Sequence, residues 1–201
     1  MEMKIFILVS LMFVFGSFIG IISGYIGGLF DNIVMRIVDV FLAFPSLVLA
    51  IAVAGVLGGG MINAMIAIGV IGWTKYARLA RGEVLEIKEE TFIKAARLSG
   101  NSSMYIIFKH IMPRVLSTLI VTESLDIGTT IMEMAALSFL GLSSPLPIPE
   151  WGAMMNEGKS MIQFAPWITI APGIAIFIIV ILFNLLGDVV HDMLDPKQKE
   201  Y

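Results

Sequence analysis

Residues 167–186 read WITIAPGIAIFIIVILFNLL, a run of 20 residues without a charged side chain. An α-helix of about 20 apolar residues is long enough to cross the hydrocarbon core of a bilayer. Similar apolar stretches occur at residues 5–22, 37–57, 62–76 and 115–140. None of them alternates apolar with polar residues, as the strands of a membrane barrel do. The sequence therefore predicts an all-α, polytopic integral membrane protein with about five transmembrane helices, forming a single domain over residues 1–201.

Composition points to the same class and excludes several functions. Hydrophobic residues make up 58% of the 201 residues and charged residues 14%, with a mean hydropathy of +0.92, which leaves too little polar surface for a soluble globule. The net charge is -3 and the basic residues are scattered, so we expect no nucleic acid as a partner. The chain has no cysteine, its two histidines lack metal-ligand spacing, and no serine lies in a nucleophile-elbow pattern. We expect no catalytic residue, no metal and no cofactor.

The basic residues predict the orientation, because Lys and Arg are enriched in cytoplasmic loops. Five alternating spans place all of them on one face except Lys4 and Lys159. That face is expected to be cytoplasmic, with residue 201 inside and residue 1 outside. A first span without an inner basic cluster rarely starts outside, so we expect a further span to precede residue 1.

Small residues predict local packing and turns. Gly16 and Gly20 leave one edge of the first helix without side chains, where another helix can approach closely. The neighbouring pair Gly27 and Gly28 indicates a turn, and Pro45 removes a backbone donor and is expected to kink the second span.

The longest polar segment, residues 75–114, is expected on the cytoplasmic side. Residues 83–98 have the pattern of one amphipathic helix, Gly100 suits a left-handed helix end, and Asn101 or Ser102 can cap the next helix. We therefore expect a helical hairpin on the inner membrane surface.

Within this segment, the sequence KAARLSG at residues 94–100 is followed nine residues later by HIMP at residues 110–113. This spacing resembles the cytoplasmic loop of ABC importer permeases, in which Glu-Ala-Ala, three residues and Gly precede nine residues and Ile-x-Leu-Pro. Lys94 stands where that family has glutamate, while histidine at position 110 is common in its peptide and nickel branch. The resemblance implies an ATPase-coupling loop at about residues 77–114. Its contact residues would be Lys94, Ala95, Ala96, Arg97, Leu98, Gly100, His110 and Pro113.

Further stretches at residues 36–45, 137–142, 149–154, 183–188 and 194–196 are similar to the dipeptide, oligopeptide and nickel importer group. The resemblance implies a permease subunit that carries peptides or nickel and metal chelates and leaves ATP hydrolysis to another subunit. It implies a second homologous permease, cytoplasmic ATPase subunits and an extracellular or periplasmic substrate-binding protein as partners. The setting would be the lipid of a bacterial or archaeal cell (inner) membrane. An outer loop at about residues 141–165, with Trp151 and Gly152 in a short helix, is expected to contact the binding protein.

The fourth apolar stretch carries Glu123, Asp126 and Glu133, although each charge at mid-bilayer costs about 2.5 to 3.5 kcal/mol. At about 100° per residue, these acids and Thr130 fall within an arc of about 80°. That face is predicted to point into the bundle or a translocation pathway. The alternative is that the acids pair with Lys or Arg of a neighbouring span. Two other hypotheses remain for the function of the chain. It could be a secondary transporter that uses the acids as coupling-ion sites, or a structural membrane subunit.

Overall fold

The computed structural model describes residues 2–143 and 149–194, and all regular structure in these ranges is helical. This confirms the all-α class. In chain order the elements are α1 (Glu2–Ile26), α2 (Gly28–Leu42), α3 (Ser46–Val56), α4 (Met61–Ile87), α5 (Thr91–Leu98), α6 (Ser103–Ile106), the π-helix η1 (Ile107–Ile111), α7 (Met112–Phe139), α8 (Trp151–Gly158), the 3₁₀ helix η2 (Lys159–Met161) and α9 (Trp167–Leu194). Part of the expected outer loop, residues 144–148, and the C-terminal residues 195–201 lie outside the described residues.

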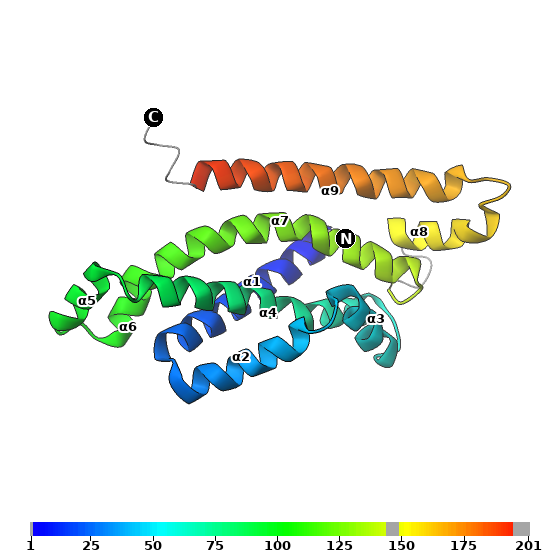
Figure 1. Ribbon diagram of the computed structural model, residues 1–201. Coiled ribbons are helices and arrows are strands. Elements are labelled where there is room, and N and C mark those ends of the chain that lie inside the picture. Colours follow the sequence, from blue (N-terminus) through cyan, green and yellow to red (C-terminus); the bar gives the residue numbers. More distant parts are fainter. Residues whose placement is uncertain (1, 144–148, 195–201) are drawn as a thin grey trace.

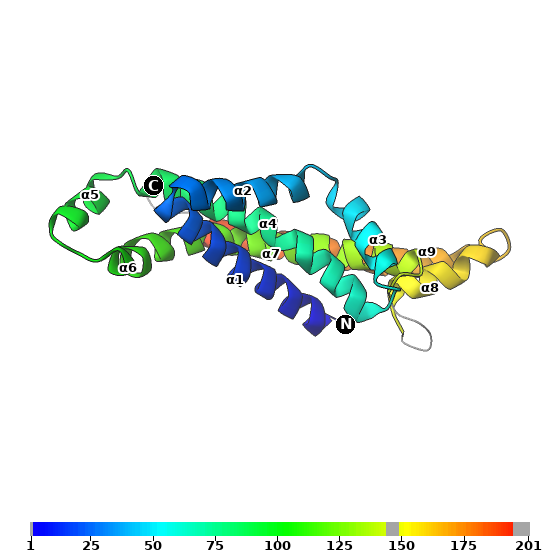
Figure 2. The same ribbon diagram turned by 90° about the horizontal axis from the view of Figure 1, so that it is seen from below.

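The long helices run along one another, with α4 at the centre of the bundle (Figure 1). α4 packs against α1, α2, α3 and α7, while α9 packs against α7 and α8. The short helices α5 and α6 lie at one end of the bundle, and α3 and α8 lie at the other (Figure 2). The segments expected on the two sides of the membrane are therefore at opposite ends of the molecule, as alternating spans require.

The close contact between α1 and α4 depends on glycine. A Cβ added to Gly16 would lie 2.3 Å from the carbonyl oxygen of Trp73, and one added to Gly20 would lie 2.3 Å from that of Ala77. The backbones of the two helices are therefore nearly in contact, which confirms the predicted close approach. The predicted turn is also present, because Gly27 has a φ of 68° between α1 and α2.

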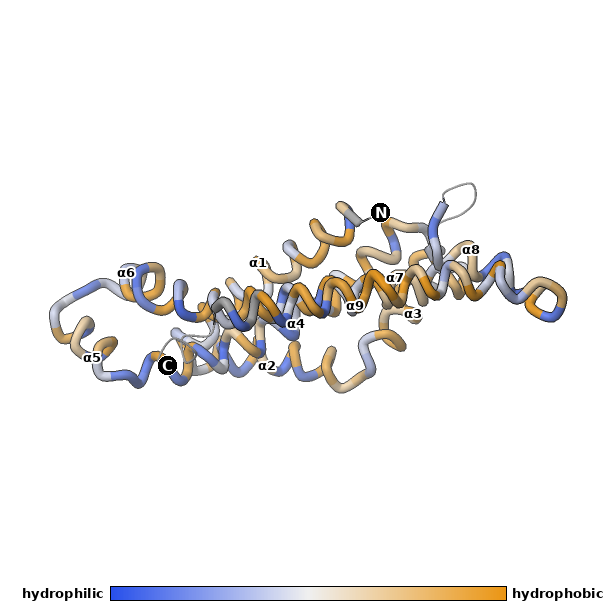
Figure 3. Tube along the Cα trace, turned by 90° about the horizontal axis from the view of Figure 1, so that it is seen from above, coloured by the Kyte–Doolittle hydropathy of each residue, from blue (hydrophilic) through white to orange (hydrophobic). Residues whose placement is uncertain are grey.

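Length and composition alone identify three of the roughly five expected spans, or four if α2 and α3 form one span. Three segments of the described chain are long and apolar enough to cross a membrane: Met3–Ile26, Ser103–Phe139 and Trp167–Val189. α9 is apolar over most of its length (Figure 3). The expected span at residues 62–76 forms the first part of α4, which has 27 residues but carries charged side chains from Lys75 onward. α4 accommodates them because α1, α2, α3 and α7 surround it.

The expected span at residues 37–57 is not one kinked helix. α2 begins earlier, at Gly28, and ends before Pro45, after which α3 continues at an angle of 88°. Taken together, α2 and α3 are long and apolar enough to form a fourth span, which would be broken at the bend, or a re-entrant loop. The proline breaks the helix completely because its ring excludes the helical hydrogen bond and its ψ of 127° is extended.

The expected amphipathic helix at residues 83–98 is also divided. α4 ends at Ile87 and α5 begins at Thr91, with Glu90 extended at a ψ of 148°. On a straight helix Ile87 and Ile93 would point about 120° apart. Both are buried, so the turn between them lets the two side chains enter the same core.

Candidate functional site

A pocket of about 420 Å³ lies between α1, α2, α3, α4 and α7. This volume is within the range of about 300 to 1,000 Å³ that is typical of ligand sites. Most of its lining is apolar, but α4 and α7 contribute charged and hydroxyl side chains. The polar lining residues are Ser46, Thr74, Lys75, Asp126, Thr129, Thr130 and Glu133.

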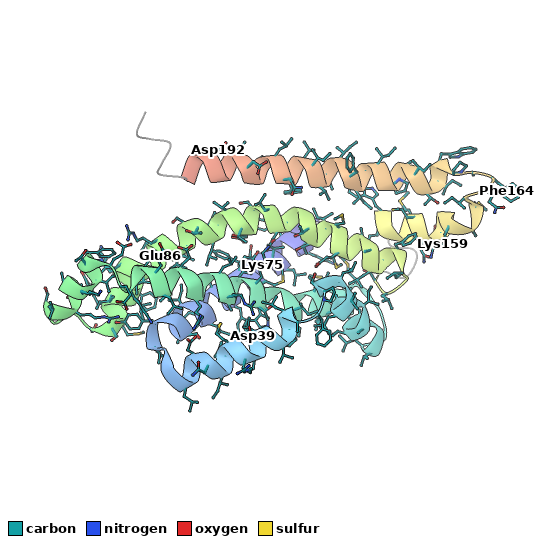
Figure 4. All side chains as sticks on the ribbon, viewed as in Figure 1. Asp39, Lys75, Glu86, Lys159, Phe164 and Asp192 are labelled. Carbon is teal, nitrogen blue, oxygen red and sulfur yellow. The ribbon has the colours of Figure 1, made fainter. Side chains whose placement is uncertain are left out.

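An ion pair joins the two helices across the pocket. The ammonium Nζ of Lys75 on α4 lies 2.5 Å from Oδ1 of Asp126 on α7. Lys75 lies between α4 and α7 (Figure 4), and its side chain is 50% exposed whereas that of Asp126 is 11% exposed. Removing a carboxylate from water is costly unless it gains a partner of opposite charge. Asp126 therefore fits both sequence-based interpretations, since it faces the pocket and pairs with a neighbouring helix.

Glu133 lies two turns further along the same face of α7. Its Oε1 accepts a hydrogen bond of 2.8 Å from the hydroxyl of Ser46, the first residue of α3 after the break at Pro45. Thr130 is buried between the two acids and lines the same pocket. Three of the four predicted pathway residues are thus brought together.

Glu123 is the exception, because it does not line the pocket. Its Oε1 accepts a hydrogen bond of 2.9 Å from the hydroxyl of Ser10 on α1. α1 packs against α7 and gives this carboxylate a separate environment. The helical periodicity placed it on the same arc as the other acids but could not show which neighbouring helix covers that part of α7.

Sequence reasoning missed Lys75 and Ser46 as residues of the site. Lys75 was counted only as a basic residue of the cytoplasmic side, although it also lies inside the apolar stretch 62–76. A lysine within such a stretch was the available signal, since it needs an acidic partner in the bundle. Ser46 carried no comparable signal, because its role depends on the start of α3 lying within hydrogen-bonding distance of α7.

At the opposite end from α8, α5 presents a largely exposed surface. Lys94, Ala95, Arg97 and Gly100 are exposed, and Leu98 is 90% exposed. Ala96 is partly buried against the core. A leucine so exposed at the tip of a helix is a surface that a partner could cover. Gly100 has a φ of 80°, which confirms the predicted left-handed helix end.

Several contacts hold this surface in place. The hydroxyl of Ser102 accepts a hydrogen bond from the backbone nitrogen of Tyr105, which confirms the predicted cap. Nζ of Lys94 lies 3.1 Å from Oε2 of Glu89, and this hydrogen bond lowers the pKa of the Glu89 carboxyl. The guanidinium of Arg97 lies 5.3 Å from the ring centroid of Tyr25, at the end of α1.

The remaining residues of the predicted loop lie where the chain enters α7. The ring of His110 lies between Phe92 and Tyr105, with centroid separations of 6.1 Å and 5.8 Å. Pro113 is exposed in the first turn of α7, directly after η1. The loop therefore continues into the helix that carries Asp126.

The short helix α8 holds both residues that are expected to contact a binding protein. Trp151 is partly exposed, as a residue that contacts another protein must be. Gly152 is buried, and a Cβ at this position would lie 2.4 Å from the carbonyl oxygen of Ala135 on α7. This glycine lets α8 pack closely on α7, and its expected contact with a binding protein stays a prediction.

The amino-acid sequence matches a family of transport proteins. Residues 16–200 match the family described as binding-protein-dependent transport system inner membrane component. The chain belongs to this family, whose members are membrane components of transport systems, in agreement with the resemblance found in the cytoplasmic segment.

Similar curated proteins carry more specific names. The chain is 45% identical over 186 residues to a dipeptide transport system permease protein DppC of Alkalihalophilus pseudofirmus, covering 92% of this chain and 61% of that protein. It is 46% identical over 184 residues to a glutathione transport system permease protein GsiD of Pectobacterium atrosepticum, with coverage of 92% and 61%. The chain thus spans about three fifths of the length of these relatives. Both relatives are named as transport system permease proteins.

A solved structure has the same fold. A chain of the MetNI methionine ABC transporter in inward-facing conformations superposes with a TM-score of 0.75, covering 96% of this chain and 93% of that one. The sequence identity is 18%, so this similarity describes the fold. It shows that this chain has the fold of that transporter chain.

Proposed function

We propose that this chain is the permease subunit of an ATP-driven importer of short peptides in a bacterial or archaeal cell membrane. In this proposal the pocket between α4 and α7 is part of the translocation pathway. The α5–α6 segment, including Ala95, Leu98 and Gly100, is the surface that docks a separate ATPase. The substrate class follows the relatives named for dipeptide and glutathione. The alternative substrate class within the same group of importers is nickel or metal chelates.

The observation that carries the proposal is the course of α7. Its first turn holds Pro113 of the docking segment, and its middle holds Asp126 and Glu133 of the pocket. At about 1.5 Å per residue, some 20 Å of continuous helix separates Pro113 from Asp126. A displacement imposed at the docking segment would therefore reach the pocket through a single rigid element.

The same proposal assigns the partners. A second permease of the family would complete the pathway, because one chain supplies only one wall of a translocation route. A substrate-binding protein would deliver the peptide at the end of the bundle that carries α8, with Trp151 as a contact. The opposite end would receive the ATPase pair, whose closure on ATP binding drives alternating access.

The test is to purify the tagged chain after co-expression with candidate ATPase, second-permease and binding-protein genes of the same genome. We expect the ATPase to co-purify, and peptide with its binding protein to stimulate ATP hydrolysis in proteoliposomes. Nickel chelates supplied in place of peptide decide between the two substrate classes. Uptake by the chain alone, without an ATPase and driven by an ion gradient, would instead establish the secondary transporter.

A further inference from the structure

The charges that line the pocket are unevenly partnered. Lys75, Asp126 and Glu133 are its charged lining residues. Lys75 neutralises Asp126 at 2.5 Å. Among the described residues, Glu133 has the hydroxyl of Ser46 as its hydrogen-bond partner and no ion pair. One carboxylate is therefore in excess in a pocket whose walls are mostly apolar.

A hydroxyl donor does not neutralise a carboxylate. An ionised group removed from water is stabilised chiefly by a charge of opposite sign. Hydrogen bonds to charged groups also contribute more free energy than those between neutral groups. Glu133 is thus placed to receive a cation that enters the pocket. An ammonium group suits this position, because it can donate to the carboxylate and still leave the bond from Ser46 in place.

Lys75 offers the complementary feature. An ammonium group has three donors, and the bond to Asp126 uses one of them. The side chain of Lys75 is 50% exposed and lines the pocket, so further donors can reach an anion without breaking the pair. Asp126 would keep its partner, which avoids the cost of an unpaired carboxylate.

The distance between Glu133 and Lys75 limits the length of a ligand that could contact both. Asp126 and Glu133 are seven residues apart on one helix, which corresponds to about 10 Å along its axis and almost the same angular position. Lys75 lies at the level of Asp126. An extended chain advances about 3.3 to 3.6 Å per residue, so two or three residues separate their terminal charges by a distance that fits.

We propose that the pocket binds a short zwitterionic peptide of two or three residues during transport. Its protonated amino terminus lies on Glu133, and its carboxylate lies on the free donors of Lys75. The apolar lining, which includes Phe41 and Ile71, accepts the peptide's side chains. The site deepens the proposed function, on which it rests in taking the pocket as part of the pathway.

The test measures binding by the purified full chain in detergent, without an ATPase or binding protein. Thermal unfolding is followed by tryptophan fluorescence with trialanine, N-acetyl-trialanine or trialanine amide at millimolar concentration. A ligand that binds only the folded state raises the unfolding temperature, and a titration gives the dissociation constant. We expect trialanine to bind, with affinity reduced about tenfold or more by N-acetylation, which removes the ammonium. The amide, which removes the carboxylate, should weaken binding less, because the pocket has an excess of negative charge.

The protein variants supply matched controls. Glu133→Gln keeps an oxygen acceptor for Ser46 but loses the charge, and it should weaken trialanine binding about tenfold or more. Glu123→Gln makes the same change on the same helix, where the carboxylate also bonds to a serine hydroxyl but lies outside the pocket. It should bind trialanine like the wild type. Lys75 itself is left unchanged, because its removal would leave Asp126 unpaired.

The outcomes separate this inference from the proposed function. Equal binding of trialanine and its N-acetyl form, an unaffected Glu133→Gln variant, or no binding by the wild type would each overturn the inference. If the ATPase still co-purifies in that case, the transport role stands without this peptide site. Binding that depends on Glu133 in a chain that recruits no ATPase would support the site and overturn the importer.

Discussion

If the proposed function holds, replacing Gly100 by aspartate should prevent docking of an ATPase while leaving the membrane bundle folded. Gly100 ends α5 with a φ of 80°, and an added Cβ would meet no atom within 4 Å. The backbone nitrogen of Asn101 donates to the carbonyl of Ala96 at 3.3 Å and closes the helix end. Because the space is open, the intrinsic cost is that of a left-handed backbone, about 1 to 2 kcal/mol.

That cost lowers the population of the native helix end about 5- to 30-fold relative to its unwound alternative. The new carboxylate would also add charge to the exposed surface formed by Ala95 and Leu98. Both effects act at the proposed docking surface. We expect Gly100→Asp to retain its membrane insertion and its thermal unfolding temperature to within a few degrees, and to lose ATPase co-purification and peptide-stimulated hydrolysis.

Gly27 provides a stringent control, because its Cβ position is also open and its φ of 68° and ψ of -158° lie in a region that is essentially restricted to glycine. Gly27→Asp therefore carries a backbone cost at least as large at the same end of the bundle, but outside α5 and α6. It should keep the ATPase bound. The docking argument is refuted if Gly27→Asp loses as much hydrolysis as Gly100→Asp, or if Gly100→Asp behaves like the wild type in the assembled complex.

Three further predictions address packing, charge and orientation. Gly20→Ala should destabilise the purified chain by about 1 to 3 kcal/mol in thermal or denaturant unfolding through overpacking, whereas Gly55→Ala, whose Cβ meets nothing within 4 Å, should be neutral or stabilising; equal unfolding midpoints would contradict the close helix contact. Asp126→Asn should lower the free energy of unfolding by about 1 to 3 kcal/mol, which is less than the loss of a partner in a fully buried ion pair, because Lys75 is half-exposed. The same change should reduce peptide uptake; unchanged stability and uptake would show that the pair is dispensable. In intact cells, an impermeant thiol reagent should label Ser160→Cys but not Ser99→Cys, and the reverse pattern would invert the topology.

The features that the sequence predicted correctly depend on the chemistry of single positions. A left-handed end needs a residue such as Gly100, a helix start favours a residue such as Ser102, and a close helix contact needs small residues such as Gly16. Each requirement is visible in the residue itself. The acid face of α7 was predicted for a similar reason, since helical periodicity alone places Asp126, Thr130 and Glu133 on one side.

The features that it missed depend on which helices meet. The break after Ile87 exists because this side chain and Ile93 enter one core, and no local pattern shows that core. The assignment of Asp126 to Lys75 and of Glu123 to Ser10 depends on where α4 and α1 cross α7. The buried position of Gly152 likewise follows from the docking of α8 on α7, and a glycine in an outer segment does not reveal this by itself.

Two helices, α4 and α7, connect the pocket to the proposed docking segment. α4 leads into α5 and carries Lys75, while α7 follows η1 and carries Asp126, so the two halves of the ion pair belong to the helices that enter and leave the proposed docking segment. α4 is also tied to α2, because Arg81 makes two hydrogen bonds of 2.7 Å to Asp31. Force applied at α5 would then move α4 together with α2, and the Lys75–Asp126 pair would bear the displacement relative to α7. In the proposed mechanism, the same contact that holds the peptide carboxylate would therefore sense closure of the ATPase.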